Sequence, residues 1–249
     1  MGFNVDSTNN KVTVDHSHNN YAVTTVAGNP IVKTFSTIEV TSIFARTKGK
    51  RQRTDPGDNS PMLYALKGIG DLTTTYRSVA MLYHNYREIM ASVVMHKEPQ
   101  GLWDCVVPMP SSSKLSSLMA KTIVRHAGVG PIQPSLLKKV TGDAVLASLD
   151  GLVISSKDKT ALRTEVRRFI KFNGGETDFQ MKSIKSVDLR CHLSPFMLGS
   201  EPLQHQPNRI LLVDDMVTSG TSIVSAAALL STHYPQAHIE AVTLFGSSR

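Results

Sequence analysis

Two carboxylates, a glycine and four hydroxyl side chains follow one another in a single short stretch of the chain. Residues 210–222 read Ile-Leu-Leu-Val-Asp-Asp-Met-Val-Thr-Ser-Gly-Thr-Ser, and an Ala/Leu-rich run comes after them. This pattern predicts a buried strand, an acidic edge, a loop and the start of a helix. The first amides of a helix have no intrahelical partners and favour an anion such as phosphate. We therefore expect a phosphate-binding loop directly after two acidic side chains.

The acidic pair is Asp214 and Asp215. Two groups that only accept hydrogen bonds suit the hydroxyls of a sugar whose phosphate is held by the loop. Glycine lets the backbone approach an anion or adopt a positive φ. The candidate phosphate-binding residues are Thr218, Ser219, Gly220, Thr221 and Ser222. Each hydroxyl residue among them is also a candidate helix N-cap, so an acidic strand end before an ordinary capped helix is the alternative. The chain has no Gly-x-x-x-x-Gly-Lys-Ser/Thr motif, which excludes a P-loop site.

A second strand, hydroxyl-rich turn and helix occur earlier in the chain. The apolar run 103–108 predicts a buried strand, and apolar residues from Leu115 to Ile123 predict a helix that stops at Gly128. Carboxyl ends of parallel strands share one edge of a sheet, so this turn and the first loop can flank one ligand. The candidate anion-binding residues here are Ser111, Ser112, Ser113 and Lys114. A serine N-cap with solvated neighbours is the alternative.

The remaining patterns predict an α/β fold with a parallel sheet and helices on both faces. Residues 238–245 predict a third parallel strand, and residues 73–96 a helix. Short alternating segments predict a small β-rich appendage at residues 1–60, with a strand at 36–44. Residues 135–206 lack a clear parallel strand and predict an inserted lid or subdomain. Within it, 157–171 has helical spacing, although a hairpin around Asn173-Gly174-Gly175 fits equally well.

Taken in order, these motifs resemble the type I phosphoribosyltransferases, and among them the competence-protein-F-like branch. The resemblance covers residues 61–246 and is carried by Ala65-Leu66-Lys67-Gly68, by Asp104-x-x-Val107-Pro108-x-Pro110 and by Leu211-Leu212-Val213-Asp214-Asp215. It implies a phosphoribosyltransferase-like α/β domain at 61–249 with a variable lid at 135–206. It also implies binding of 5-phospho-α-D-ribose 1-diphosphate (PRPP) with Mg²⁺.

The resemblance further assigns a role to each candidate stretch. Asp214 and Asp215 hold the ribose hydroxyls and are the catalytic pair, residues 218–222 cradle the 5-phosphate, and residues 111–114 meet the diphosphate. Mg²⁺ is expected on that diphosphate, with Asp214 or Asp215 as its protein ligand. The implied activity is an enzyme of nucleotide metabolism that transfers phosphoribose to a nitrogenous base, or the reverse. The alternative is a non-catalytic sensor of PRPP or nucleotides that binds nucleic acid or a protein.

Charge and composition bear on partners and location. The net charge is +7, and Arg46, Lys48, Lys50, Arg51 and Arg53 form a basic cluster that predicts either a solvated loop or a contact with phosphate or nucleic acid. No apolar run approaches the roughly 18 residues of a membrane span, and no secretory signal pattern is present. We therefore expect a cytoplasmic protein without a membrane partner, in a homo-oligomer or a larger complex. Cys105, inside an apolar run, is expected to be a buried thiol.

Overall fold

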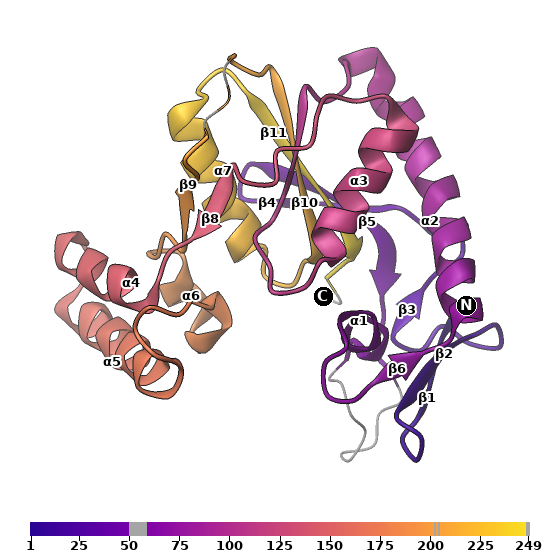
Figure 1. Cartoon of the computed structure of the whole chain (residues 1–249), viewed down its shortest axis with the longest axis horizontal. Coiled ribbons are helices and arrows are strands. Elements are labelled where there is room, and N and C mark those ends of the chain that lie inside the picture. The colour runs from indigo at the N-terminus through magenta and orange to yellow at the C-terminus, as the bar shows by residue number, and fades with distance from the viewer. Residues whose placement is uncertain (50–58, 202, 204, 248–249) are drawn as a thin grey trace.

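The fold is mixed α/β and is built around a six-stranded sheet with the strand order β3-β5-β11-β10-β7, in which β4 also pairs with β5 (Figure 1). The computed structural model describes residues 1–49, 59–201, 203 and 205–247. Parallel pairing joins β5 (Ile38–Arg46), β11 (His238–Phe245), β10 (Arg209–Met216) and β7 (Cys105–Pro108). Two antiparallel strands, β3 (Ala22–Val23) and β4 (Ile31–Phe35), pair with β5. The expected strands at 103–108 and 238–245 are confirmed.

Helices cover both faces of this sheet. The helices on one face are α1 (Pro61–Lys67), α2 (Tyr76–Lys97) and α3 (Leu115–Ala127), and α7 (Thr221–His233) covers the other. Because side chains alternate along a strand, Leu211 and Val213 of β10 pack towards the first group while Ile210 and Leu212 pack towards α7. The helices expected at 73–96 and after residue 114 are confirmed.

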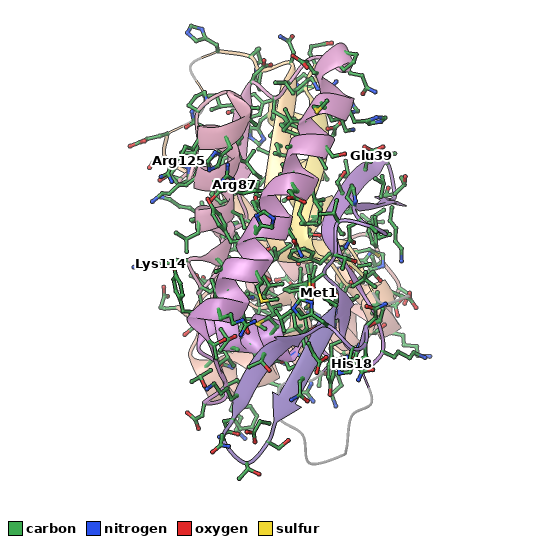
Figure 2. All side chains as sticks on the ribbon, turned by 90° about the vertical axis from the view of Figure 1, so that its right-hand side faces the viewer. Met1, His18, Glu39, Arg87, Lys114 and Arg125 are labelled. Atoms are coloured by element: carbon green, nitrogen blue, oxygen red, sulfur yellow. The ribbon has the colours of Figure 1, made fainter. Side chains whose placement is uncertain are left out.

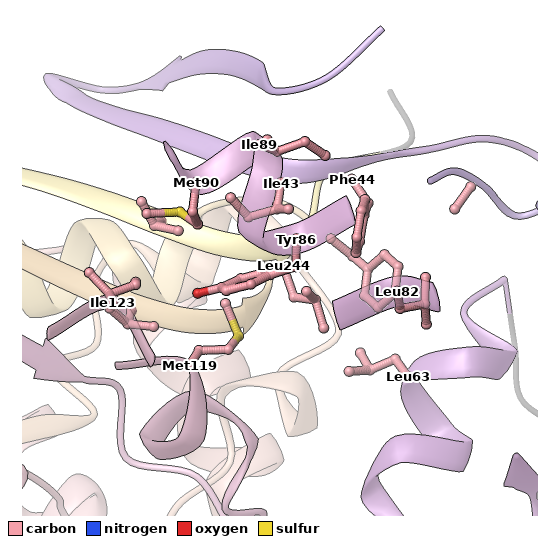
Figure 3. Packing of buried hydrophobic residues seen from close by; sticks show 14 of the residues in the cluster. Ile43, Phe44, Leu63, Leu82, Tyr86, Ile89, Met90, Met119, Ile123 and Leu244 are labelled. Carbon is pink, nitrogen blue, oxygen red and sulfur yellow. The ribbon is translucent and has the colours of Figure 1, made fainter. Parts of the chain in front are cut away.

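The layer of α1, α2 and α3 encloses the larger core. Figure 3 shows Tyr86 and Ile89 of α2, Met119 of α3 and Leu244 of β11 gathered in this cluster. On the outside of the same layer, Figure 2 shows Arg87 and Arg125 at the surface. The thiol of Cys105 is buried as expected, and burial together with the charge of Asp104 raises its pKa to about 12.

The first 46 residues contribute to two different sheets, unlike the separate appendage expected for residues 1–60. A small sheet contains β1 (Gly2–Asp6), β2 (Lys11–Asp15) and β6 (Thr73–Thr74), whereas β5 lies inside the central sheet beside β11. The sequence did not indicate that β5 is a central strand, because it contains the polar residues Thr41 and Ser42. Both are nevertheless buried, and Ser42 Oγ lies 2.9 Å from Thr243 Oγ1. The hydroxyls of Ser42 and Thr243 contact one another across the strands, so the polar side chain of Ser42 does not mark a solvent-facing side.

Residues between β7 and β10 contain a helical unit with a core of its own. The antiparallel strands β8 (Leu137–Lys139) and β9 (Phe196–Leu198) lead to it, and its helices are α4 (Gly142–Ser148), α5 (Ser156–Asn173) and α6 (Val187–Arg190). Short 3₁₀ turns are η2 (Leu149–Gly151) and η3 (Met181–Ser183), with η1 (Glu98–Gln100) after α2. Val145, Leu162, Phe169 and Phe179 belong to the separate core. The helix predicted at 157–171 is confirmed, and the hairpin alternative is wrong because α5 continues to Asn173.

A buried charge cluster ties the sheet to α2 at the amino ends of the strands. Glu240 of β11 accepts from Lys97 Nζ at 3.0 Å, from Arg209 Nη2 at 2.8 Å and from Trp103 Nε1 at 2.9 Å. Burial raises the pKa of Glu240, but the hydrogen bonds from Trp103 and Lys97 and the charges of Lys97 and Arg209 outweigh it, so this pKa is lowered overall. Lys97 also pairs with Glu39.

We expect Lys97→Met to lower the free energy of unfolding by about 3 kcal/mol at pH 7, because it removes one partner of a buried ion pair. Because the pKa of Glu240 is lowered in the folded protein, the cluster contributes its full stabilisation at pH values above about 4.3, the ordinary carboxyl pKa. This stabilisation is lost as the pH falls through the folded-state pKa. Urea unfolding at pH 7 and at pH 3 measures both effects, and Lys121→Met, at an exposed lysine of α3, is the control. Equal urea midpoints for the Lys97 variant and the parent at pH 7 contradict the assignment.

Candidate functional site

The two predicted anion-binding stretches leave the sheet side by side. In the parallel register of β7 and β10, Val213 lies opposite Pro108, and the amide of Met109 donates to the carbonyl of Val213 at 2.8 Å. On the other side of β10, the amide of Val217 donates to the carbonyl of Phe245 at 3.0 Å. The turn after β7 and the loop after β10 therefore begin at the same edge of the sheet.

The two adjacent carboxylates have different partners. Asp215 is buried, and its Oδ2 lies 2.6 Å from Nζ of Lys67 in the last turn of α1. Asp214 lines a cavity together with the loop, and its Oδ1 accepts from the amide of Asp215 at 2.8 Å and from Ser116 Oγ at 3.4 Å. Strand alternation explains the division, because neighbouring side chains of β10 point to opposite faces. Asp214 is thus the carboxylate that faces the loop.

The environment of Asp214 raises the pKa of its carboxyl group. Burial raises the pKa of Asp214 to about 7, and the nearby charge of Asp215 also raises it. The hydrogen bond from the Asp215 amide, the charge of Lys67 and the hydrogen bond from Ser116 lower the pKa by less. A hydroxyl donor or a cation beside this carboxylate would favour its charged form. The side chain is therefore sensitive to what occupies the cavity.

The loop after β10 leads into a helix that begins at a glycine. Gly220 is the N-cap of α7 with φ 74°, and no side chain caps the helix. The N-cap interpretation of Thr218, Ser219, Thr221 and Ser222 is therefore wrong, and these hydroxyls do not cap α7. Ser219 Oγ lies 2.9 Å from Thr221 Oγ1. A Cβ placed on Gly220 would lie 2.3 Å from Cδ1 of Phe35, so both the positive φ and the close packing require glycine.

Side chains from the inserted unit complete the cavity over this loop. The cavity has a volume of about 120 Å³. From the central domain it is lined by Asp214 and by residues 216–223, and from the insert by Met181, Lys182 and Arg190. The sequence did not indicate Lys182 and Arg190 as site residues, because they lie in short helical segments that contain no recognisable binding motif. Their approach to the loop is set by tertiary structure alone.

The serine turn after β7 is largely exposed. Ser111, Ser112 and Lys114 are exposed, Ser113 is half-buried, and the amide of Ser113 donates to Ser111 Oγ at 3.3 Å. Lys114 is the N-cap of α3, which has no side-chain cap, so the serine N-cap alternative is wrong here as well. The residue of α3 that contacts the acidic pair is the buried Ser116. Together with Lys67, it is a site residue that sequence reasoning did not assign.

The basic cluster begins at the same edge of the sheet, because β5 runs parallel to β11 and ends at Arg46. The guanidinium of Arg46 is half-buried and donates from Nη2 to the carbonyl of Asn59 at 3.4 Å. Lys48 is exposed. The other members of the predicted cluster, Lys50, Arg51 and Arg53, lie outside the described residues. The prediction of a nucleic-acid contact stays a prediction.

Comparison of the chain with models of protein families, with curated proteins and with solved structures finds no match. Within the described ranges, no three His, Cys, Asp or Glu side chains are grouped so that they could hold a metal ion. No helix in the part of the chain that the structure describes is long and apolar enough to cross a membrane. The residues of the cavity itself are therefore the basis for its function.

We expect Gly220→Ala to destabilise the protein by about 1–3 kcal/mol more than Gly128→Ala. Both glycines have a positive φ, 74° and 61°, so both substitutions strain the backbone. A Cβ at Gly128 meets nothing within 4 Å, whereas one at Gly220 meets the ring of Phe35. The difference between the two variants in the free energy of unfolding, measured with urea, is the steric contribution of the contact with Phe35. Equal destabilisation would show that Phe35 does not pack against the loop backbone.

Proposed function

We propose that this protein is a Mg²⁺-dependent phosphoribosyltransferase with a sheet of the type I phosphoribosyltransferase kind. It binds PRPP and transfers phosphoribose to a nitrogenous base, or carries out the reverse reaction. The observation that carries the proposal is the placement of Asp214 in one cavity with an uncapped, glycine-started helix N-terminus. A carboxylate beside an anion-favouring loop suits a sugar hydroxyl and the phosphate on the same sugar.

The neighbouring residues support a ligand that lies along this edge of the sheet. In the proposal, residues 218–222 hold the 5-phosphate and Asp214 accepts from a ribose hydroxyl. Lys67 positions the buried Asp215 through the ion pair at 2.6 Å. The serine turn at 111–114 starts beside the loop, and the exposed Lys114 is available to the diphosphate.

The reaction is a displacement at the anomeric carbon of the ribose. The bond from that carbon to the diphosphate oxygen breaks, the diphosphate leaves with the electron pair, and a nitrogen of the base forms the new bond. Positive charge develops on the ribose, so the carboxylates of Asp214 and Asp215 stabilise the transition state electrostatically. Lys114 offsets the negative charge of the leaving diphosphate. The protein otherwise acts by holding donor and acceptor in line.

The residues at this edge fit Mg²⁺ bound through the substrate. Magnesium sites of this kind use one or two carboxylates together with phosphate oxygens. Asp215 is engaged by Lys67, so Asp214 is the carboxylate available to such an ion. When bound, Mg²⁺ would neutralise the diphosphate and make it a better leaving group.

Changing both Asp214 and Asp215 to Asn should weaken PRPP binding roughly tenfold or more and stop diphosphate release, because charged hydrogen-bond acceptors are lost. Since the pKa of Asp214 is about 7, binding by the parent should strengthen between pH 6 and pH 8 as this carboxylate ionises. Isothermal titration calorimetry with PRPP and Mg²⁺ measures both, and a panel of bases identifies the acceptor.

The control for this experiment is the double variant Glu176→Gln with Asp178→Asn. It changes the net charge equally, at two exposed carboxylates of the insert. Binding of PRPP should match the parent. If the Asp214 and Asp215 double variant also binds PRPP like the parent, the site assignment is refuted.

A second candidate function is a non-catalytic PRPP or nucleotide sensor that binds nucleic acid or a protein. It is favoured by the basic segment that leaves β5 at the same edge as the cavity. Exchanging Arg51 and Arg53 for Glu should then abolish a salt-sensitive association with RNA or DNA, measured by fluorescence anisotropy at two salt concentrations. A charge-matched exchange of Lys157 and Lys171 for Glu, both exposed on α5, is the control. If the variant at Arg51 and Arg53 associates with nucleic acid like the parent, and salt has no effect, the basic cluster is not the binding surface.

A further inference from the structure

Arg190 lies where two cavities meet. The first is the cavity of about 120 Å³ over the phosphate loop. The second, of about 640 Å³, lies between the α6 region of the insert, the outer face of α7 and the turn at Phe35 and Ser36. Arg190, Ser219 and Thr221 line both of them. The two spaces are therefore neighbours that share one cation and two hydroxyls.

Arg190 shares the smaller cavity with one carboxylate, Asp214, and the larger cavity with another, Asp188. The Nε of Arg190 donates to the carbonyl of Ile184 at 2.7 Å, which fixes the half-buried guanidinium in place. Among the described residues, no carboxylate lies within ion-pair distance of it. What it meets is the hydroxyl loop and the N-terminus of α7, which carries a partial positive charge of its own. Arg190, Lys182 and this helix end face the small cavity against one carboxylate, Asp214, so positive charge predominates there and favours an anion.

The sizes of the cavities show how much of a ligand each one takes. Ligand sites of proteins commonly measure about 300–1,000 Å³, so the smaller cavity takes only the sugar phosphate, whereas the larger one falls within this range. Its lining joins apolar side chains, such as Phe35, Leu193 and Val224, with several hydroxyls. Asp188 is its one carboxylate among the described residues. Such a lining suits a nucleoside, whose base is flat and apolar and whose hydroxyls and amine donate to oxygens.

We propose that Arg190 binds the phosphate held by the loop and that the ligand continues past this phosphate into the larger cavity. The ligand class is then a ribose whose 5-phosphate is joined, in a diphosphate, to a nucleoside, and it is a second ligand of the loop besides PRPP, whose 5-phosphate is free. This inference rests on the proposed function, because the loop and Asp214 hold the same ribose phosphate in both. It adds a second half of the ligand and a residue of the insert that contacts the phosphate.

ADP-ribose and ribose 5-phosphate form a matched pair of probes, because only ADP-ribose continues past the 5-phosphate. By calorimetry on the full chain, ADP-ribose should bind about tenfold more tightly than ribose 5-phosphate. Ala228→Trp fills the larger cavity from the exposed face of α7 and should remove this difference without changing the affinity for ribose 5-phosphate. Arg190→Gln should weaken both ligands about tenfold, and Arg190→Lys should restore part of the loss.

Arg167→Gln, at an exposed arginine of α5 in the same insert, is the control and should bind both probes like the parent. Thermal unfolding of each variant checks that it is folded. Equal affinities of the parent for the two probes, or an Ala228→Trp variant that keeps the difference, would overturn the extended ligand. Unchanged binding by Arg190→Gln would overturn the role of Arg190. If one of these results is found but PRPP still binds in a way that depends on Asp214 and Asp215, the proposed function stands. If PRPP, ADP-ribose and ribose 5-phosphate all fail to bind, both the proposed function and this inference are refuted.

Discussion

The parallel pairing of β7, β10 and β11 is the constraint on which the candidate site depends. Because Val213 lies opposite Pro108 and Asp214 opposite Thr243, the loops that follow these strands start at one edge. Hydrogen bonds from Met109 and Val217 continue the pairing beyond the strands and fix the first residue of each loop. A shift by one residue would exchange the faces of Asp214 and Asp215. The register thus determines which carboxylate meets the cavity.

The ion pair of Lys67 makes two adjacent carboxylates tolerable at a buried strand end. Two like charges raise one another's pKa, and burial adds to that effect. Lys67 compensates Asp215 directly, at 2.6 Å, and acts on Asp214 only as a distant charge. The consequence is a division of roles, in which Asp215 is held by Lys67 and Asp214, with a pKa raised to about 7, faces the cavity. The position of α1 therefore sets the electrostatics of the cavity, although α1 does not line it.

Local patterns predicted the elements that carry the site, but not the contacts between distant elements. The strand and loop of residues 210–222 were predictable because an apolar run, an acidic edge and a glycine have local structural consequences. The place of β5 was not, because Thr41 and Ser42 are polar, and only the structure shows that both are buried and that the Ser42 hydroxyl contacts Thr243 across the sheet. The same limit applies to Lys67, Ser116 and Arg190, whose roles come from tertiary packing. No periodicity marks such residues.

The insert is held over the loop after β10 by contacts that do not involve a ligand. Its own core makes it a compact unit, and the pairing of β8 with β9 holds its two ends together. Phe196 of β9 packs in the same cluster as Ile223 of α7, and Ser225 Oγ of α7 donates to the carbonyl of Leu193 at 3.5 Å. Because these contacts immediately follow α6 in the chain, they fix the end of the helix that carries Arg190. In the proposed binding mode, the guanidinium of Arg190 is thereby placed beside the loop before the anion binds, which reduces the cost of ordering a long side chain on binding.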